Sequence, residues 1–321
     1  MPLVNDPKHL VLLGATGTIG RAVLAQAQAD GHRVTCLTRA RAMLPDGAAQ
    51  IAVDLADPLA VREALTGLDA DCVLSCMASR KGSARDAWAV DHRAQLHVLE
   101  GAKATGIGQF VLLSAICVQK PLLEFQRAKL AFEGELQHSG LDWSIVRPTA
   151  FFKSLSGQVA RVQAGKPFLL FGDGELTACK PISDRDLARY LLDCVTLPER
   201  RGRVLPIGGP GPALTPRGQG ALIFELTGQP ARFRHVPVAL MDGIIGVLSA
   251  LGRVSSSMRE KAEFARIGRY YATESMLVWD EGTGRYDADA TPEFGADTLR
   301  DHYVALIRGE RGVDLGDHAV F

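Results

Sequence analysis

The chain has 321 residues, 47% of them hydrophobic and 22% charged, so it is long enough for one large domain or for one domain with a smaller lobe. Its 36 Lys and Arg balance its 36 Asp and Glu, which argues against a dedicated nucleic-acid binder, because such a protein needs surplus cations to displace phosphate counterions. The six cysteines form no CxxC pair and show no zinc spacing, which favours free thiols in a reducing cytoplasm and no bound metal.

The first half of the chain alternates short apolar runs with helix-like stretches. Strands are expected at residues 9–13, 33–37, 50–53, 72–75, 110–114 and 143–147. Helices are expected between them at 19–30, 58–65, 84–105 and 123–139. This alternation predicts an α/β fold with a doubly wound parallel sheet of the Rossmann type, in a domain that spans residues 1–150.

The second half, from residue 151, is less regular and carries Gly- and Pro-rich segments such as FGDGE and IGGPGPALTP. Helices are expected at 183–196 and 216–227. The apolar run 236–252 is shorter than the roughly 20 residues of a membrane span, so a buried or surface-lying helix is expected there. Residues 151–321 therefore predict a smaller substrate-binding lobe at the carboxyl edge of the sheet, with some segments returning to the sheet. Residues 1–17 show neither a charged leader nor a long apolar core, so no secretory signal is expected.

A glycine-rich loop joins the first expected strand to the first expected helix. The glycines of GATGTIG serve a tight turn, a close approach of backbone to pyrophosphate, and the packing of helix on strand. The helix N-terminus then offers free N–H groups and a positive dipole end to phosphates. The loop predicts a dinucleotide site, with a ligand-free glycine turn as the alternative. The candidate residues are Gly14, Thr16, Gly17, Thr18, Ile19 and Gly20.

The choice of cofactor is indicated at the end of the second strand. Arg39, with Arg41 close by, stands where an NAD site places an acid for the ribose 2′-hydroxyl. A guanidinium matches a 2′-phosphate, so we expect NADPH; two solvated arginines are the alternative. Asp54, after the third strand, is a candidate adenine contact or the N-cap of the helix that starts at Pro58. Pro148, which follows the sixth strand, is a further candidate cofactor contact.

The stretch LEFQRAK lies where a short-chain reductase carries Tyr-x-x-x-Lys, but Phe125 takes the place of the tyrosine while Lys129 is retained. Ser114 lies at the end of the fifth strand, where a short-chain reductase carries a serine that faces the substrate. The alternative is an ordinary polar residue at a strand end. Phe125 has no proton to give, so a polarised C=C bond fits this site better than a ketone, whose alkoxide needs a donor at once. Lys129 would hold the ribose, and Lys129, Glu124 or water would supply the proton. The alternative is a helix turn without chemistry.

Several segments together resemble one family of reductases. These are GATGTIGR, LSAICVQKPLLEFQRAKL, RPTAFFKSLSGQV, FGDGELTACKPIS, LPIGGPGPALTP and IGRYYATESMLVWD. They are similar to the 8-vinyl-reductases of divinyl chlorophyllides, within the atypical, NmrA-like and isoflavone-reductase-like branch of short-chain reductases. The resemblance covers nearly the whole chain, and the glycine loop is its least specific part.

The resemblance implies that NADPH reduces the 8-vinyl group of a magnesium chlorin to ethyl in chlorophyll or bacteriochlorophyll biosynthesis. The lobe would then offer a flat apolar cleft with a few polar anchors. Candidate cleft walls are Phe151, Phe152 and Phe168, with Met241 and residues 244–251 as a softer side. Candidate anchors for the propionate carboxylate are Lys153, Lys180 and Arg147. Each of these residues has a core or ion-pair role as its alternative, and no histidine stands out as a magnesium ligand.

The sequence is also compatible with three rival interpretations. The first is another C=C-reducing atypical reductase of the isoflavone-reductase kind, and the second is an NmrA-like regulator that senses NADP. The third is an assembly factor on a photosynthetic membrane. A transient contact with the membrane surface through the apolar helix, and contacts with other enzymes of pigment biosynthesis, are left open as partners.

Overall fold

The structure is a computed structural model, and it describes residues 6–45, 48–80 and 83–310. The expectation of a missing secretory signal depends partly on residues 1–5, which lie outside the described residues.

A seven-stranded parallel sheet forms the centre of the first domain, with the strand order β3-β2-β1-β4-β5-β6-β8. The strands are β1 (His9–Leu13), β2 (Arg33–Thr38), β3 (Ala49–Ala52), β4 (Cys72–Ser75), β5 (Gln109–Leu113), β6 (Asp142–Pro148) and β8 (Arg203–Ile207). The six expected strands are confirmed with bounds that differ by one residue at most at either end. β8, from the second half of the chain, was not expected; it pairs with β6 at the edge of the sheet.

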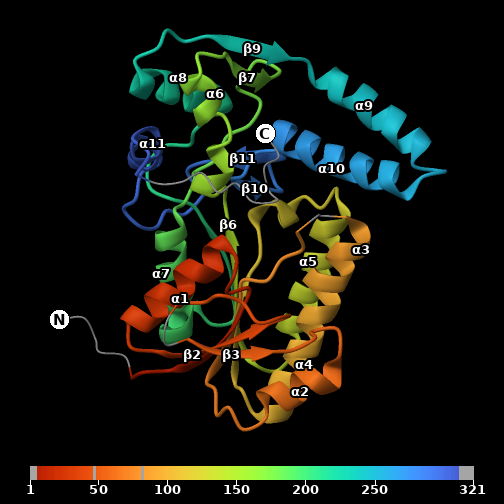
Figure 1. The fold of residues 1–321 in the computed structure, drawn as a ribbon, viewed down its shortest axis with the longest axis vertical. Helices are drawn as coiled ribbons and strands as arrows, with labels where there is room; N and C mark the ends of the chain where they lie inside the picture. The colour runs from red at the N-terminus through yellow and green to blue at the C-terminus, as the bar shows by residue number, and fades with distance from the viewer. Residues whose placement is uncertain (1–5, 46–47, 81–82, 311–321) are drawn as a thin grey trace.

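Helices cover both faces of this sheet (Figure 1), as a doubly wound fold requires. α1 (Thr18–Ala29) and α7 (Asp184–Thr196) lie on one face, where their apolar side chains join an extensive buried cluster. α2 (Pro58–Leu65), α4 (Gln95–Thr105) and α5 (Glu124–Gln137) cover the other face with a second buried cluster. The rigid sheet between them fixes the loops at its carboxyl edge.

The helix expected at 84–105 contains a change of helical type. It begins as α3 (Ala84–Ala87), continues as a π-helical segment (Trp88–Ala94) and ends as α4. Wide π-helical turns inside helices are frequent at functional sites. Here the π-helical segment contains Asp91, whose side chain is fully buried.

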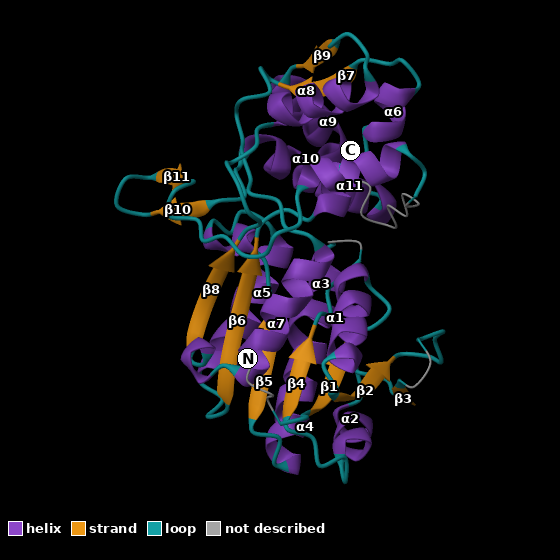
Figure 2. Cartoon of the chain, turned by 90° about the vertical axis from the view of Figure 1, so that its left-hand side faces the viewer, coloured by secondary structure: helices purple, strands orange, loops and turns teal. Residues whose placement is uncertain are grey.

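The second lobe lies above the carboxyl ends of the strands (Figure 2). Its core is built from a short 3-10 turn (Phe152–Leu155), α6 (Val159–Gln163), α8 (Pro216–Thr227) and α11 (Leu299–Ile307). A two-stranded parallel sheet of β7 (Phe168–Phe171) and β9 (Phe233–Val236) completes it. The antiparallel pair β10 (Val278–Asp280) and β11 (Arg285–Asp287) follows further along the chain.

A helical hairpin projects from the lobe above α3 and α5 (Figure 1). It consists of α9 (Val238–Leu251) and α10 (Ser256–Thr273), and no residue of α9 is buried. The sequence predicted α9 but not α10, α11 or the β10–β11 pair. Within the described residues, no helix combines the length and the apolar character that a membrane span requires.

Candidate active site

The glycine loop between β1 and α1 has the backbone shape that a pyrophosphate needs. Gly14 adopts a positive φ of 76°, and a Cβ there would lie 2.6 Å from the carbonyl oxygen of Cys76. Gly20 packs directly on the Gly14 backbone, so it too has no room for a side chain. Gly17, by contrast, is exposed and is the N-cap of α1 without a side-chain cap, and the first turn of α1 has no acidic residue. The first N–H groups of α1 are therefore open to an anion, which fits a dinucleotide.

Arg39 and Arg41 follow β2 and are both exposed. Arg41 lines a shallow pocket with Ala48, Gln50 and Ala52 beside β3. Neither guanidinium has an ion-pair partner within 4 Å among the described residues. Both remain available for a 2′-phosphate, and that role stays a prediction.

The expected N-cap role of Asp54 is wrong, because Asp57 caps α2 by accepting hydrogen bonds from the N–H groups of Leu59 and Ala60. The carboxylate of Asp54 instead accepts the N–H of Ala56, at 2.9 Å, in the loop after β3. Its adenine contact stays a prediction, as does the cofactor contact of Pro148, which is buried at the end of β6.

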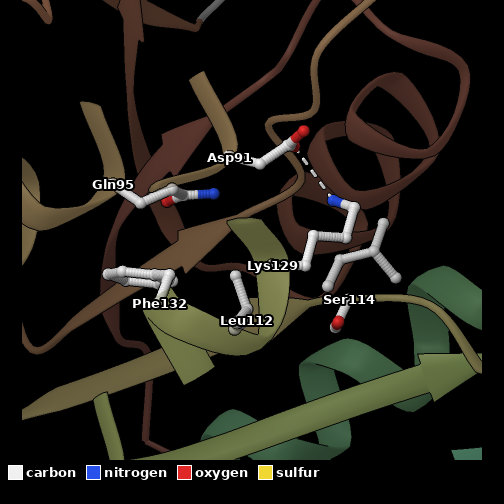
Figure 3. Close-up of a pocket in the computed structure, with 7 residues that line it drawn as sticks. Asp91, Gln95, Leu112, Ser114, Lys129 and Phe132 are labelled. Atoms are coloured by element: carbon white, nitrogen blue, oxygen red, sulfur yellow. Dashed lines mark hydrogen bonds and ion pairs between the residues drawn. The ribbon is translucent and has the colours of Figure 1, made fainter. Parts of the chain in front are cut away.

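Lys129 of α5 forms a largely buried ion pair. Its ammonium donates to Oδ1 of Asp91 at 3.0 Å, and the two side chains face each other (Figure 3) with exposed fractions of 13% and 0%. Asp91 also accepts from the N–H and the hydroxyl of Ser79, at 3.1 and 2.6 Å. These bonds fix the position of the lysine side chain. Sequence reasoning missed Asp91, because nothing in the pattern of a long amphipathic helix marks one acid as a partner of α5.

Ser114 belongs to a second buried network. Its hydroxyl points away from the Lys129 ammonium (Figure 3) and donates to Glu133 Oε1 at 2.5 Å. Glu133 is buried and also accepts from the guanidinium of Arg147, through Nε at 3.2 Å and through Nη2. Arg147, proposed as a substrate anchor, is thus paired inside the fold. In this conformation the Ser114 hydroxyl is turned to Glu133, so a catalytic role for it stays a prediction.

Phe125, which replaces the expected phenol, is packed in a small apolar cluster. The cluster also contains Ala128, Cys117 and Tyr270 of α10, with Tyr271 packed against it. The hydroxyl of Tyr270 donates to the backbone carbonyl of Cys117 at 3.0 Å, which ties α10 to the loop after β5. The position one turn before Lys129 is therefore filled by hydrocarbon, and Phe125 has no proton to transfer.

Glu124 begins α5 and lies at the surface. Its carboxylate accepts from the indole N–H of Trp88 at 3.1 Å and pairs with Arg127 at 2.5 Å. These hydrogen bonds, that of Trp88 first, lower the pKa of Glu124 below its usual value. A carboxyl group that is ionised at neutral pH is a poor proton donor, so the structure disfavours Glu124 in that role.

The structure changes the assignment of several expected substrate contacts. Phe152 and Phe168 are 5% and 1% exposed and belong to the buried core of the second lobe, together with side chains of α8 and α11; they are not cleft walls. Phe151 is half-buried against the sheet domain. Lys180 is buried and pairs with Glu293 at 2.6 Å, so its charge is already neutralised.

Lys153 lies at the glycine loop and not in the interior of the lobe. It belongs to the 3-10 turn that follows β6, and its ammonium donates to the hydroxyl of Thr18, at 3.0 Å. Thr18 is the first residue of α1. This contact was not predictable from a sequence pattern, because the two residues are 135 positions apart.

The fold and the loop define a nicotinamide-dinucleotide-binding protein. The sequence profile of a family described as NAD(P)H-binding matches residues 14–198, and the chain belongs to that family. The structure of Pal from Bacillus thuringiensis shows the same fold, with a TM-score of 0.69 at 15% identity over 94% of this chain and all of the other.

The relatives identify the family more narrowly. A protein named divinyl chlorophyllide a 8-vinyl-reductase, chloroplastic, from Oryza sativa subsp. indica is 48% identical over 99% of this chain and 84% of its own length. Proteins of the same name from Zea mays, Cucumis sativus and Arabidopsis thaliana are 45–46% identical. Photosystem II assembly factor Ycf39 from Cyanophora paradoxa is 30% identical over 73% of each chain. The chain belongs to the divinyl chlorophyllide a 8-vinyl-reductase family.

Proposed function

We propose that this chain reduces the 8-vinyl group of divinyl chlorophyllide to ethyl, with NADPH as the reductant. The observation that carries this proposal is the 48% identity with the rice reductase over 99% of the chain. The site geometry supports it, because the chain combines a dinucleotide loop with a fixed Lys129 and lacks a phenol at Phe125.

Several residues are placed to bind the parts of the cofactor. The bound cofactor supplies a hydride. The open N-terminus of α1 would bind its pyrophosphate, Arg39 and Arg41 its 2′-phosphate, and Lys129 its nicotinamide ribose. Asp91 keeps the Lys129 ammonium in place, so Lys129 would offer the ribose a prepositioned donor.

The absence of a phenol suits a vinyl group conjugated to a macrocycle. Charge that develops on such a carbon spreads into the ring, so no donor has to neutralise an oxyanion at once. Because the lowered pKa of Glu124 keeps that carboxyl ionised, Lys129 and water are the better proton sources. The chemistry of the site therefore fits a C=C bond better than a ketone.

The decisive experiment is anaerobic incubation of the purified protein with divinyl chlorophyllide a and NADPH. The 8-ethyl product, separated by chromatography, is the expected result, with NADH far less effective. A parallel incubation with an isoflavone tests the rival reductase interpretation. NADPH binding without reduction of any pigment would contradict the proposed substrate and favour the sensor interpretation.

The apolar helix α9 supports a transient contact with a membrane surface. Leu240, Ile244, Val247 and Leu251 are spaced by four, three and four residues, so they share one helix face, and they are 47–61% exposed. Near the end of the hairpin, Arg253, Arg259 and Lys261 are exposed and have no ion-pair partner among the described residues. An apolar face beside unpaired cations fits an anionic lipid surface.

Vesicle flotation tests this contact. Wild-type protein is expected to float with anionic vesicles and less with zwitterionic ones, and the double variant Ile244→Asn/Val247→Asn should stay in solution. Leu59→Asn on α2 is the matched control, because Leu59 is also exposed, at 66%. Equal flotation of all three proteins would exclude α9 as the contact. A cytoplasmic location and contacts with other pigment enzymes stay predictions.

A further inference from the structure

Lys153 carries a charge that the fold leaves without a counterion. Of the three cations expected to bind a substrate carboxylate, Arg147 pairs with Glu133 and Lys180 pairs with Glu293. Among the described residues, Lys153 has no carboxylate within 4 Å, and its ammonium donates to the neutral hydroxyl of Thr18. It is only partly exposed, so water does not fully replace a counterion.

The surroundings of Lys153 are positive as well. Thr18 is the first residue of α1, and the partial positive charge of that helix end is not offset by an acid in its first turn or by a side-chain cap at Gly17. A cation placed beside the positive end of a helix is unfavourable until an anion binds both. The Lys153–Thr18 contact therefore points to an anionic ligand at the glycine loop.

The position of Lys153 is set by its neighbours in sequence. The N–H of Phe152 donates to Ile182 at 3.2 Å, and the Phe152 ring is buried in the core of the second lobe. The 3-10 turn thus directs the lysine toward the sheet domain while the preceding phenylalanine anchors the lobe. Lys153 thereby reaches the first residue of α1 from a segment that belongs to the second lobe.

We propose that Lys153 binds the pyrophosphate of the dinucleotide, and not the carboxylate of the substrate. The proposal rests on the cofactor part of the proposed function and is independent of the pigment. Lys153 is a cofactor-binding residue contributed by the segment that begins the second lobe. Its charge complements the N–H groups of α1, which bind the same phosphates.

The test is a titration of NADPH and of NADH by cofactor fluorescence, without pigment, on wild type, Lys153→Gln and Lys153→Arg. Loss of one charge-assisted hydrogen bond should weaken both dinucleotides by about 10- to 100-fold in Lys153→Gln. Lys153→Arg should restore most of the affinity, and the dependence of Kd on salt should be shallower in Lys153→Gln. Lys166→Gln is the matched control, since Lys166 is exposed and its side chain has no hydrogen-bond or ion-pair partner among the described residues.

Three results would overturn the proposal. The first is a Kd of Lys153→Gln that is unchanged for both dinucleotides together with a raised KM for the pigment, which would show that Lys153 binds the substrate carboxylate. The second is weaker binding of NADPH alone, which would assign it to the 2′-phosphate. The third is an equal loss in Lys153→Arg and Lys153→Gln with a lowered Tm in both, which would make the role structural. A wild type that binds cofactor but reduces no pigment would refute the substrate and leave this assignment intact.

Discussion

The ion pair between Lys129 and Asp91 allows the chemical role of the lysine to be separated from its structural role. Lys129→Met keeps most of the aliphatic side chain and removes the ammonium. Among the described residues, Asp91, whose side chain is fully buried, would then keep only the two hydrogen bonds from Ser79. We therefore expect loss of stability as well as loss of most activity.

The magnitude follows from the geometry. At 3.0 Å, the attraction between unit charges is about 5 kcal/mol at an effective dielectric constant of about 20. Removing one partner of a buried pair typically costs about 3–5 kcal/mol, because the other charge is left uncompensated. Since the Lys129 side chain is only 13% exposed, water compensates little of this cost. The free energy of unfolding of Lys129→Met should fall by about this amount.

The double variant Asp91→Asn/Lys129→Met provides the control. It removes both charges and should recover most of the lost stability, so the coupling energy in a double-mutant cycle should be about 2 kcal/mol or more. Activity should not recover, because no ammonium is left to hold the ribose. Urea unfolding gives the stabilities, and pigment reduction gives kcat and KM. Additive stabilities would show that the pair does not form, and recovered turnover in the double variant would remove Lys129 from the mechanism.

Three further predictions concern the cofactor site and the thiols. Arg39→Asp should shift the preference from NADPH toward NADH, and an unchanged ratio of kcat/KM values would place the 2′-phosphate elsewhere. Gly20→Ala should abolish measurable NADPH binding, because its Cβ would collide with the Gly14 carbonyl; near-wild-type affinity would contradict this packing argument. Burial raises the pKa of Cys36 and Cys194 from 9.0 to about 11, so unfolded thiols ionise first and stability should decline as pH rises from about 9 toward 11. Unfolding midpoints between pH 8 and 11, compared with those of Cys36→Ala/Cys194→Ala, measure this decline.

The sheet domain was predictable because its signals are local. Each of the six expected strands is a short apolar run bounded by turn residues, and the glycine loop identifies the first βα unit. β8 was missed because RVLPI contains a proline that makes a central strand improbable, whereas the edge position beside β6 tolerates it. α10 was missed because its apolar residues cover only part of one face and its sequence is rich in charges.

The partners of the site residues were not predictable, because they depend on contacts between distant segments. Lys129 was found from its spacing to Phe125, yet its partner Asp91 lies 38 positions away on a π-helical turn. Ser114 was found from its position after β5, yet its hydroxyl faces Glu133. A motif predicts the type of a side chain and the helix or strand that carries it. Tertiary packing decides which neighbour accepts its hydrogen bond or neutralises its charge.

The assignment of the three cations leads to a prediction about the substrate. If Lys153 binds pyrophosphate, then Arg147 and Lys180, which are already paired, leave none of the three for the propionate carboxylate. Breaking either ion pair would cost stability, because Glu133 and Lys180 are both buried and would be left with an uncompensated charge. The free acid should therefore gain little from its charge, and an esterified divinyl pigment should have a KM within about three-fold of it, a difference of less than 1 kcal/mol. Initial rates with the acid and its methyl ester measure this ratio, and a KM raised by ten-fold or more for the ester would show that a cation does bind the carboxylate.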